Sequence, residues 1–170
     1  MKFRGVVALG VSLCASLWVT AVASPVYVEK VDMPMQATMT EVKNVLHDGG
    51  YKIVLHLNIL KLIKAQQKQL KIPDFNARKF TDVQALVFCN PYDFSKLLNA
   101  DWPAAAGCPL TLDVFSKGSN SYIVYGLRAD FANTPASKKI TQSFDQAVIK
   151  VLQGIPMSRE ISKIPDLSGK

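Results

Sequence analysis

The spacing of hydrophobic residues along the chain changes repeatedly between a period of two and a period near 3.6, which marks strands and helices. Alternating or continuous apolar runs predict strands over residues 26–31, 51–58, 83–88, 110–115 and 121–127. Helical spacing predicts helices from Met35 to the stop at Asp48-Gly49-Gly50, over 59–70, and from Thr134-Pro135 to Gly154, with a shorter helix after Cys89-Asn90-Pro91.

The strand predicted over 51–58 has the clearest alternation. Its pattern predicts one apolar face and one polar face, so that the strand is half-buried. The apolar face is expected to hold Tyr51, Ile53, Leu55 and Leu57, and the opposite face Lys52, Val54, His56 and Asn58.

The order of the predicted elements is β-α-β-α-β-α-β-β-α. Residues 116–120, which contain Gly118 and Asn120, join two strands as a hairpin, so part of the sheet is antiparallel. The hairpin, the reversal at Gly49-Gly50 and the lack of a glycine-rich loop after the first strand argue against a doubly wound nucleotide-binding fold. We therefore expect an α+β domain with one sheet and helices packed mostly on one face.

The first residues have the pattern of a secretory signal peptide. Lys2 and Arg4 precede an uncharged run that ends in Ala21-Val22-Ala23, a site of the A-x-A type. An uncleaved membrane anchor is the alternative, but the run is only moderately hydrophobic. We expect cleavage between Ala23 and Ser24, export to the periplasm or beyond, and no membrane attachment afterwards. The expected divisions are a leader over 1–23, a domain over 24–156 and a mobile polar tail over 157–170.

Charge adds little to this interpretation. The chain has 20 basic and 13 acidic residues, a net charge of +7, which falls to +5 without Lys2 and Arg4. A nucleic-acid partner is not expected from so small an excess. The most basic stretch carries Lys61, Lys64, Lys68 and Lys71. It fits either an anionic partner or the solvated side of an amphipathic helix, and the second interpretation is favoured.

The sequence contains few residues that could carry catalysis. It has no G-x-S-x-G elbow, no phosphate-binding glycine loop, no C-x-x-C pair and no zinc-ligand spacing. A non-enzymatic role is therefore favoured over an enzymatic one.

Three residues remain as candidates for chemistry. His56 could be an axial ligand of a b-type haem or a metal ligand if its strand face is covered, or a solvated strand residue. Cys89 and Cys108 are the two cysteines left after removal of the leader. They form one disulfide or stay as two separate thiols, and their spacing does not decide between these alternatives.

Three segments together resemble the DUF302 family: MTEVKNVLHDGGYKIVLHLNI, VFCNPYDFSKLLNADWP and GCPLTLDVFSKGSNSYIVYG. The resemblance covers about residues 26–155, although Cys108 precedes Pro109 here where many members have the cysteine after the proline. It implies a TBP-like fold with a curved, mainly antiparallel sheet, often assembled as a dimer. The family has no settled activity, so the resemblance implies no catalytic residue.

Two functional hypotheses follow. The first is an exported, non-enzymatic module that binds a small apolar ligand or a protein partner in a groove, with a second subunit completing it. The second is a periplasmic redox accessory protein that holds haem or a metal through His56, with Cys89 as a lesser ligand candidate.

Overall fold

The computed structural model describes residues 25–162 and 164–167. They form one six-stranded sheet in the order β2-β3-β4-β5-β1-β6, and every neighbouring pair is antiparallel. The strands are β1 (Val26–Val31), β2 (Lys52–Asn58), β3 (Asp82–Cys89), β4 (Leu110–Lys117), β5 (Asn120–Gly126) and β6 (Ser158–Glu160). Within the described ranges, no helix is long and apolar enough to cross a membrane. The predicted leader and its cleavage site, Ala23 and Ser24, lie outside these ranges.

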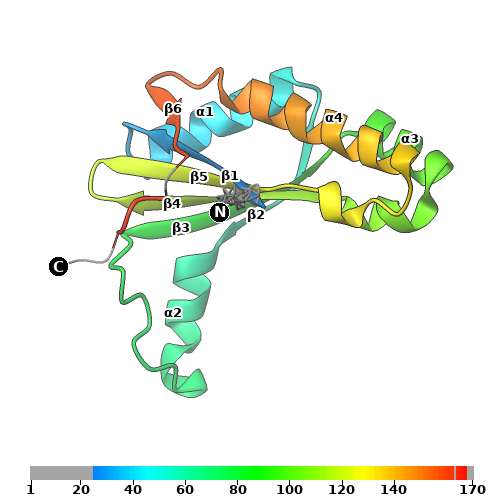
Figure 1. Ribbon diagram of the computed structural model, residues 1–170. Coiled ribbons are helices and arrows are strands. Elements are labelled where there is room, and N and C mark those ends of the chain that lie inside the picture. Colours follow the sequence, from blue (N-terminus) through cyan, green and yellow to red (C-terminus); the bar gives the residue numbers. More distant parts are fainter. Residues whose placement is uncertain (1–24, 163, 168–170) are drawn as a thin grey trace, which may run out of the picture.

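Helices cover one face of this sheet. Helix α1 (Met35–Asp48) and helix α4 (Pro135–Leu152) lie side by side on it, and α3 (Pro91–Ala100) extends beyond its end (Figure 1). Short 3-10 helices, η1 (Trp102–Gly107) and η2 (Ala129–Phe131), connect the elements around α3 and α4. The prediction of an α+β domain with an antiparallel sheet and helices mostly on one face is confirmed.

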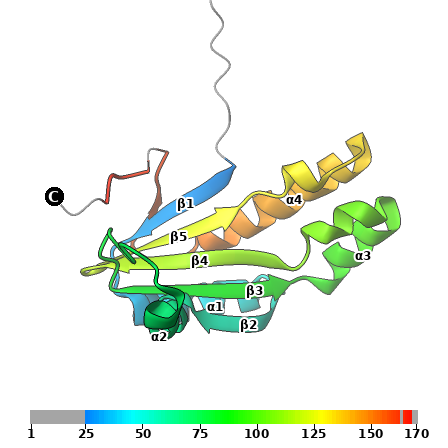
Figure 2. The ribbon, with the colours of Figure 1, turned by 90° about the horizontal axis from the view of Figure 1, so that it is seen from below.

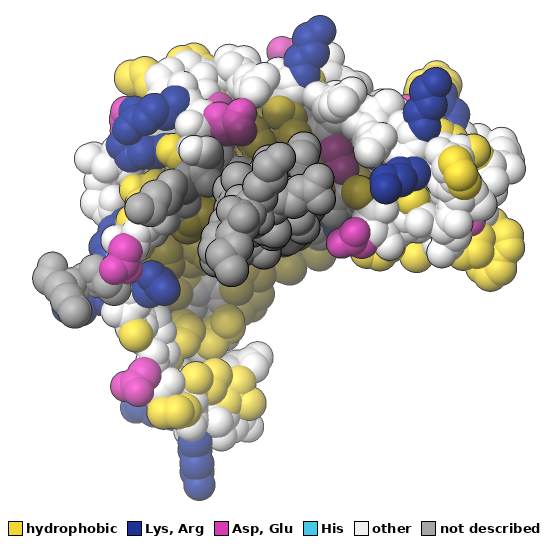
Figure 3. Space-filling view, in the orientation of Figure 1, with side chains coloured by type: hydrophobic (Ala, Val, Ile, Leu, Met, Phe, Trp, Pro, Cys, Tyr) yellow, Lys and Arg dark blue, Asp and Glu magenta, His cyan; other side chains and the backbone are white. Residues whose placement is uncertain are grey.

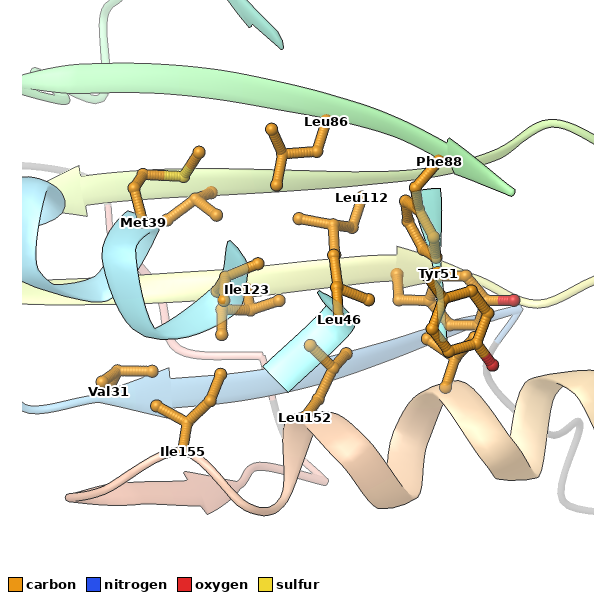
Figure 4. Packing of buried hydrophobic residues seen from close by; sticks show 14 of the residues in the cluster. Val31, Met39, Leu46, Tyr51, Leu86, Phe88, Leu112, Ile123, Leu152 and Ile155 are labelled. Atoms are coloured by element: carbon orange, nitrogen blue, oxygen red, sulfur yellow. The ribbon is translucent and has the colours of Figure 1, made fainter. Parts of the chain in front are cut away.

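The main core lies between α1, α4 and the sheet (Figure 4). Helix α1 contributes Val42 and Leu46, which are fully buried, at the spacing that one face of a helix requires. Side chains of β3, β4 and β5 meet them in register, because Leu86 pairs with Leu112 and alternate residues of these strands point to the same face. The register and the helical period together produce this continuous apolar layer.

Side-chain caps begin three of the helices. Thr134 and Ser137 form a capping box at the start of α4, as the Thr134-Pro135 signal predicts. The Asn58 side chain accepts from the backbone N–H of Lys61 at the start of α2 (Ile59–Leu70). The Asn90 side chain does the same for Tyr92 at the start of α3. These caps satisfy N–H groups that a helix cannot pair internally.

A buried carboxylate links α4 to the sheet. Asp145 accepts from the hydroxyl of Tyr125 at 2.8 Å and from the backbone N–H of Arg128 at 2.9 Å. Burial raises the pKa of Asp145, and these two hydrogen bonds partly oppose that effect. The contact fixes the middle of α4 over the end of β5.

The predicted faces of β2 are wrong. The β2–β3 register shifts between Ile53 and Leu55, so Val54 is an extra residue in a β-bulge. Before the bulge, Ile53 packs against the core, whereas Leu55 and Leu57 point to the opposite face of the sheet. His56 pairs with Leu86 and therefore shares the core-side face with Ile53. One inserted residue moves every later side chain of the strand to the opposite face of the sheet.

The prediction of a mobile tail over 157–170 is wrong for Ser158–Glu160. These residues form β6, which pairs with Glu29, Lys30 and Val31 of β1 at the edge of the sheet. The strand is only three residues long and two of them are charged, so no apolar alternation marks it in the sequence.

The packing of α1 against the sheet should contribute most to the stability of the domain. We expect Leu46→Ala to lower the free energy of unfolding by about 2–5 kcal/mol, because it leaves a cavity in a fully buried site. Leu98→Ala, at a site on α3 with 45 % exposure, should change it by less than about 0.5 kcal/mol. Urea denaturation followed by circular dichroism measures both, and similar losses in the two variants would contradict the assignment of the core.

Candidate functional site

A cavity of about 540 Å³ lies on the face of the sheet that α1 and α4 leave uncovered. Figure 2 views the molecule from that side, with α1 behind the strands and α2 in front of β2 and β3. The cavity walls come from β1, β4, β5, the loop before β3 and the last described residues. They are Val26, Val28, Arg78, Phe80, Phe115, Tyr122, Val124, Ile164, Pro165, Asp166 and Leu167.

The floor of the cavity follows from strand alternation. On β5, Ile123 and Tyr125 point into the core, so Tyr122 and Val124 point to the other side. Val28 lies opposite Val124 on β1, and Phe115 lies opposite Tyr122 on β4. Neighbouring strands therefore place apolar side chains next to one another on this face.

The loop between α2 and β3 forms one side wall. Asn76 holds its shape, since its side chain both accepts from the backbone N–H of Phe80 and donates to the carbonyl of the same residue. The Phe80 ring then packs on Phe115 with the ring centroids 5.2 Å apart. Thr81 fastens the end of the loop by donating its backbone N–H to the carbonyl of Ser116.

The last described residues form the opposite wall, and two cationic side chains hold the walls together. Lys117 donates to the backbone carbonyl of Arg78 at 2.9 Å and also to that of Leu167. The guanidinium of Arg78 lies 3.6 Å from the Asp166 carboxylate. Charged and polar contacts thus lie at the rim, while the interior is lined mainly by aliphatic and aromatic side chains.

A second cavity of about 380 Å³ lies beside the first, around β1. The two share Val26, Val28 and Ile164 as lining residues. The second cavity also contacts Glu160 and Ser162, so its lining is the more polar of the two.

Asp113 lies on the same face of the sheet as the cavity floor. It pairs with Ala85 on β3 and with Val124 on β5, and it therefore lies among the residues of the uncovered face. Desolvation raises the pKa of this carboxyl above its ordinary value of 3.8. Asp113 is therefore partly shielded from solvent on this face.

His56 does not line either cavity. Its Nε2 lies 2.6 Å from Oε1 of Gln84, and its Nδ1 lies 3.2 Å from Nζ of Lys43 on α1. Because an amide oxygen only accepts, Nε2 carries the hydrogen and the lone pair of Nδ1 faces the lysine. The chain of contacts continues from Gln84 to Asp82, which also accepts from Asn58.

These contacts give His56 a local partner for each ring nitrogen. An axial haem ligand needs a nitrogen lone pair directed at an apolar cavity. Here the lone pair meets an ammonium group, and the apolar cavity lies on the opposite face of the sheet. The hypothesis of a haem or metal site at His56 stays a prediction, which an absorption spectrum and metal analysis of the purified protein would decide.

Cys89 and Cys108 come together at the end of β3. Both are free and half-buried, and the two thiols lie in hydrogen-bond contact with each other. Burial raises the pKa of both groups, and that of Cys108 rises to about 11. Among the described residues, no group of three or more His, Cys, Asp or Glu side chains could hold a metal ion.

Comparison with known proteins identifies the family. The family model described as "Domain of unknown function DUF302" matches residues 27–155. The chain belongs to the DUF302 family.

A solved structure supports the same fold for this DUF302 domain. The crystal structure of an uncharacterized conserved DUF302 protein from Bacillus stearothermophilus aligns with a TM-score of 0.66 at 20 % sequence identity. The alignment covers 78 % of this chain and 99 % of that chain. No curated protein matches the chain.

The cavity of this DUF302 domain was not among the sequence-based candidates. Its floor residues Val28, Tyr122 and Val124 belong to strands in which both faces are apolar. That pattern indicates that something covers the second face, which is the one signal that could have located the site. The covering residues Ile164 and Leu167 carry no such signal, because they lie in a short irregular segment.

The raised pKa of Asp113 gives a prediction about how stability depends on pH. Because its folded-state pKa is raised, the unfolded chain loses this proton first, and stability falls as pH rises from 3.8 through the folded-state pKa. We expect Asp113→Asn to be more stable than the wild type at neutral pH and about equal to it below pH 3.8.

Asp101→Asn is the matched control for this experiment. Hydrogen bonds from Ser137 and Asn133 lower the pKa of Asp101, so its substitution should reduce stability at neutral pH. Urea titrations at several pH values measure both differences. An Asp113→Asn variant less stable than the wild type at neutral pH would contradict the desolvation of this face.

Proposed function

We propose that this DUF302 domain is an exported, non-enzymatic module that binds a small apolar ligand in the cavity on the uncovered sheet face. The observation that carries the proposal is the cavity itself, whose 540 Å³ lie within the range of small-molecule sites. Its floor is a rigid antiparallel sheet, and its walls are two segments held by hydrogen bonds. Such a floor keeps the site formed before the ligand arrives.

The lining favours binding over catalysis. The described residues place Tyr122, Arg78 and Asp166 as its polar side chains, and the last two pair with each other at the rim. General acid–base catalysis requires a titratable group within hydrogen-bond reach of the reacting atoms, in a defined position. The hydrogen-bonded chain at His56 lies on the other face of the sheet and cannot serve this cavity.

Export follows from the predicted leader rather than from the fold. Removal of residues 1–23 leaves a domain that begins immediately before β1, and Val26 of β1 already lines the cavity. Intact-mass measurement of the protein purified from an exporting host tests cleavage between Ala23 and Ser24. A mass that retains the leader would contradict this part of the proposal.

Substitution of the cavity floor tests the binding proposal. We expect a fluorescent long-chain fatty acid to bind the wild type and to bind Val124→Glu at least about tenfold more weakly, since the variant places a carboxylate on an apolar floor. Val124→Leu should retain binding because the floor stays apolar. Fluorescence titration of the purified full chain gives the three dissociation constants.

Gln36→Glu serves as the charge control, since it adds the same carboxylate to an exposed site on α1. It should bind the probe as the wild type does. Equal affinity of the wild type and Val124→Glu would reject the cavity as the binding site. Native mass spectrometry of the untreated protein would then show whether any ligand copurifies.

A second copy of the chain is the protein partner that the surface favours. Strand β2 lies at one edge of the sheet, with its outer hydrogen-bonding groups available to another strand. Beside this edge, Val54, Leu55, Leu62 and Leu70 are 63, 46, 50 and 55 % exposed. Hydrophobic side chains also gather along α2 and in the recess beside it (Figure 3). We propose a two-fold dimer through β2 and α2, the arrangement that self-complementary edges form.

This dimer predicts a specific change in mass. We expect light scattering coupled to gel filtration to give two copies for the wild type and one for Leu62→Glu, because the variant puts a charge into the apolar contact. Lys64→Glu changes the charge by a larger amount on the other side of α2 and should stay dimeric. A monomeric wild type at all concentrations would reject the dimer and leave the cavity proposal standing.

A further inference from the structure

The contact between Cys89 and Cys108 depends on strand pairing. Cys89 is the last residue of β3, and Cys108 lies two residues before the start of β4. These strands are antiparallel neighbours, and Phe88 is paired with Leu110 where they meet. Residues 90–107, which contain α3 and η1, connect the two strands. The strand pairing brings the two ends of this segment close together. The two thiols then lie in hydrogen-bond contact.

The two thiols are not equivalent. Cys108 packs against the main core, whereas Cys89 is not among the residues packed on it. Burial raises the pKa of both thiols. Asp93 raises the pKa of both groups, and Arg128 lowers that of Cys108. Desolvation leaves Cys108 with the larger shift, to about 11. Cys89, which does not pack on the core, is therefore the thiol that a reagent in solution reaches more easily.

From this geometry we propose that Cys89 and Cys108 form a thiol–disulfide exchange site whose oxidant is a small disulfide of the glutathione type. Cys89 is the attacking sulfur and Cys108 the resolving sulfur. The site is independent of the apolar cavity, because neither cysteine lines it. It requires only the two sulfur atoms that the strand pairing already holds together.

The reaction proceeds in two balanced steps. The Cys89 thiolate attacks one sulfur of the oxidised tripeptide, forms a mixed disulfide and releases one glutathione thiolate, which takes up a proton. Cys108 then loses its proton and attacks Sγ of Cys89, which breaks the mixed disulfide and releases the second glutathione. The two cysteines lose two electrons and two protons in total, and the oxidant gains both.

Oxidation should restrain a defined part of the molecule. A Cys89–Cys108 bond closes a covalent ring around α3 and η1, the segment that carries the exposed rings of Tyr92 and Trp102. Because the disulfide limits the local unfolding of the chain that it encloses, amide hydrogen exchange within 90–107 should slow on oxidation. The segment presenting these aromatic side chains then becomes more rigid without a change in the sheet.

The test uses protein purified from an exporting host, reduced with dithiothreitol and then separated from the reductant. Cys14→Ser is present throughout, so that thiol counts refer to Cys89 and Cys108 whether or not the leader has been removed. The protein is incubated with oxidised glutathione, quenched with a maleimide reagent and weighed by mass spectrometry. We expect both thiols to disappear together, with the loss of two hydrogen atoms and no retained glutathione. Hydrogen exchange on the same samples should slow severalfold in 90–107 and stay unchanged in α1.

Single-cysteine variants distinguish the two roles. Cys108→Ser should stop at the mixed disulfide and gain one glutathione on Cys89, whereas Cys89→Ser should react at least several-fold more slowly because Cys108 packs against the core. Denatured samples of both variants should react equally, which controls for reagent quality. Equal rates in the folded variants would overturn the assigned roles. Two thiols that react only after denaturation, or that form disulfides only between molecules, would overturn the site.

Discussion

The packing of α1 and α4 on a single face of the sheet is the constraint from which the rest of the molecule follows. Leu46, Val148 and Leu152 bury against that face and leave the other without a helical cover, except where α2 begins. An antiparallel sheet can carry an open face if that face is polar. Here it carries Val28, Phe115 and Val124 instead, so their apolar surface needs another cover.

The cover consists of irregular chain held by backbone contacts. Lys117 bonds to carbonyl groups of two segments that are far apart in the sequence, and its aliphatic stem lies at the end of the same strand that carries Phe115. Irregular walls have fewer buried contacts than helices, and local opening has a correspondingly lower free energy. A rigid floor under walls that open easily suits entry and exit of a small ligand.

The sequence predicted the fold well because most elements carry strong local signals. The boundaries of α2 and β1 match the predicted ranges, and the caps at Thr134 and Gly49 lie where turn chemistry indicated. The bulge at Val54 was missed because an extra residue in a strand leaves the apolar alternation of the sequence intact while changing the pairing. β6 was missed because it is stabilised by β1 and not by its own composition.

The candidate sites were predicted less well. Cys89 and Cys108 were recognised as a pair, but their contact depends on the β3–β4 register, which sequence spacing does not give. His56 was singled out for its strand position, and the bulge then moved it to the side of Lys43. The cavity depends on residues from both ends of the described chain, and no local pattern connects Val26 with Leu167.

The strand order has a consequence for how the domain forms. The first strand, β1, pairs with β5 and β6, the last two strands to be synthesised, so it lies between partners about a whole domain away in sequence. Closing such long loops slows folding, and here the core cannot be completed before the end of the chain is available. A chain that is still being synthesised therefore lacks the strand that covers the outer edge of β1.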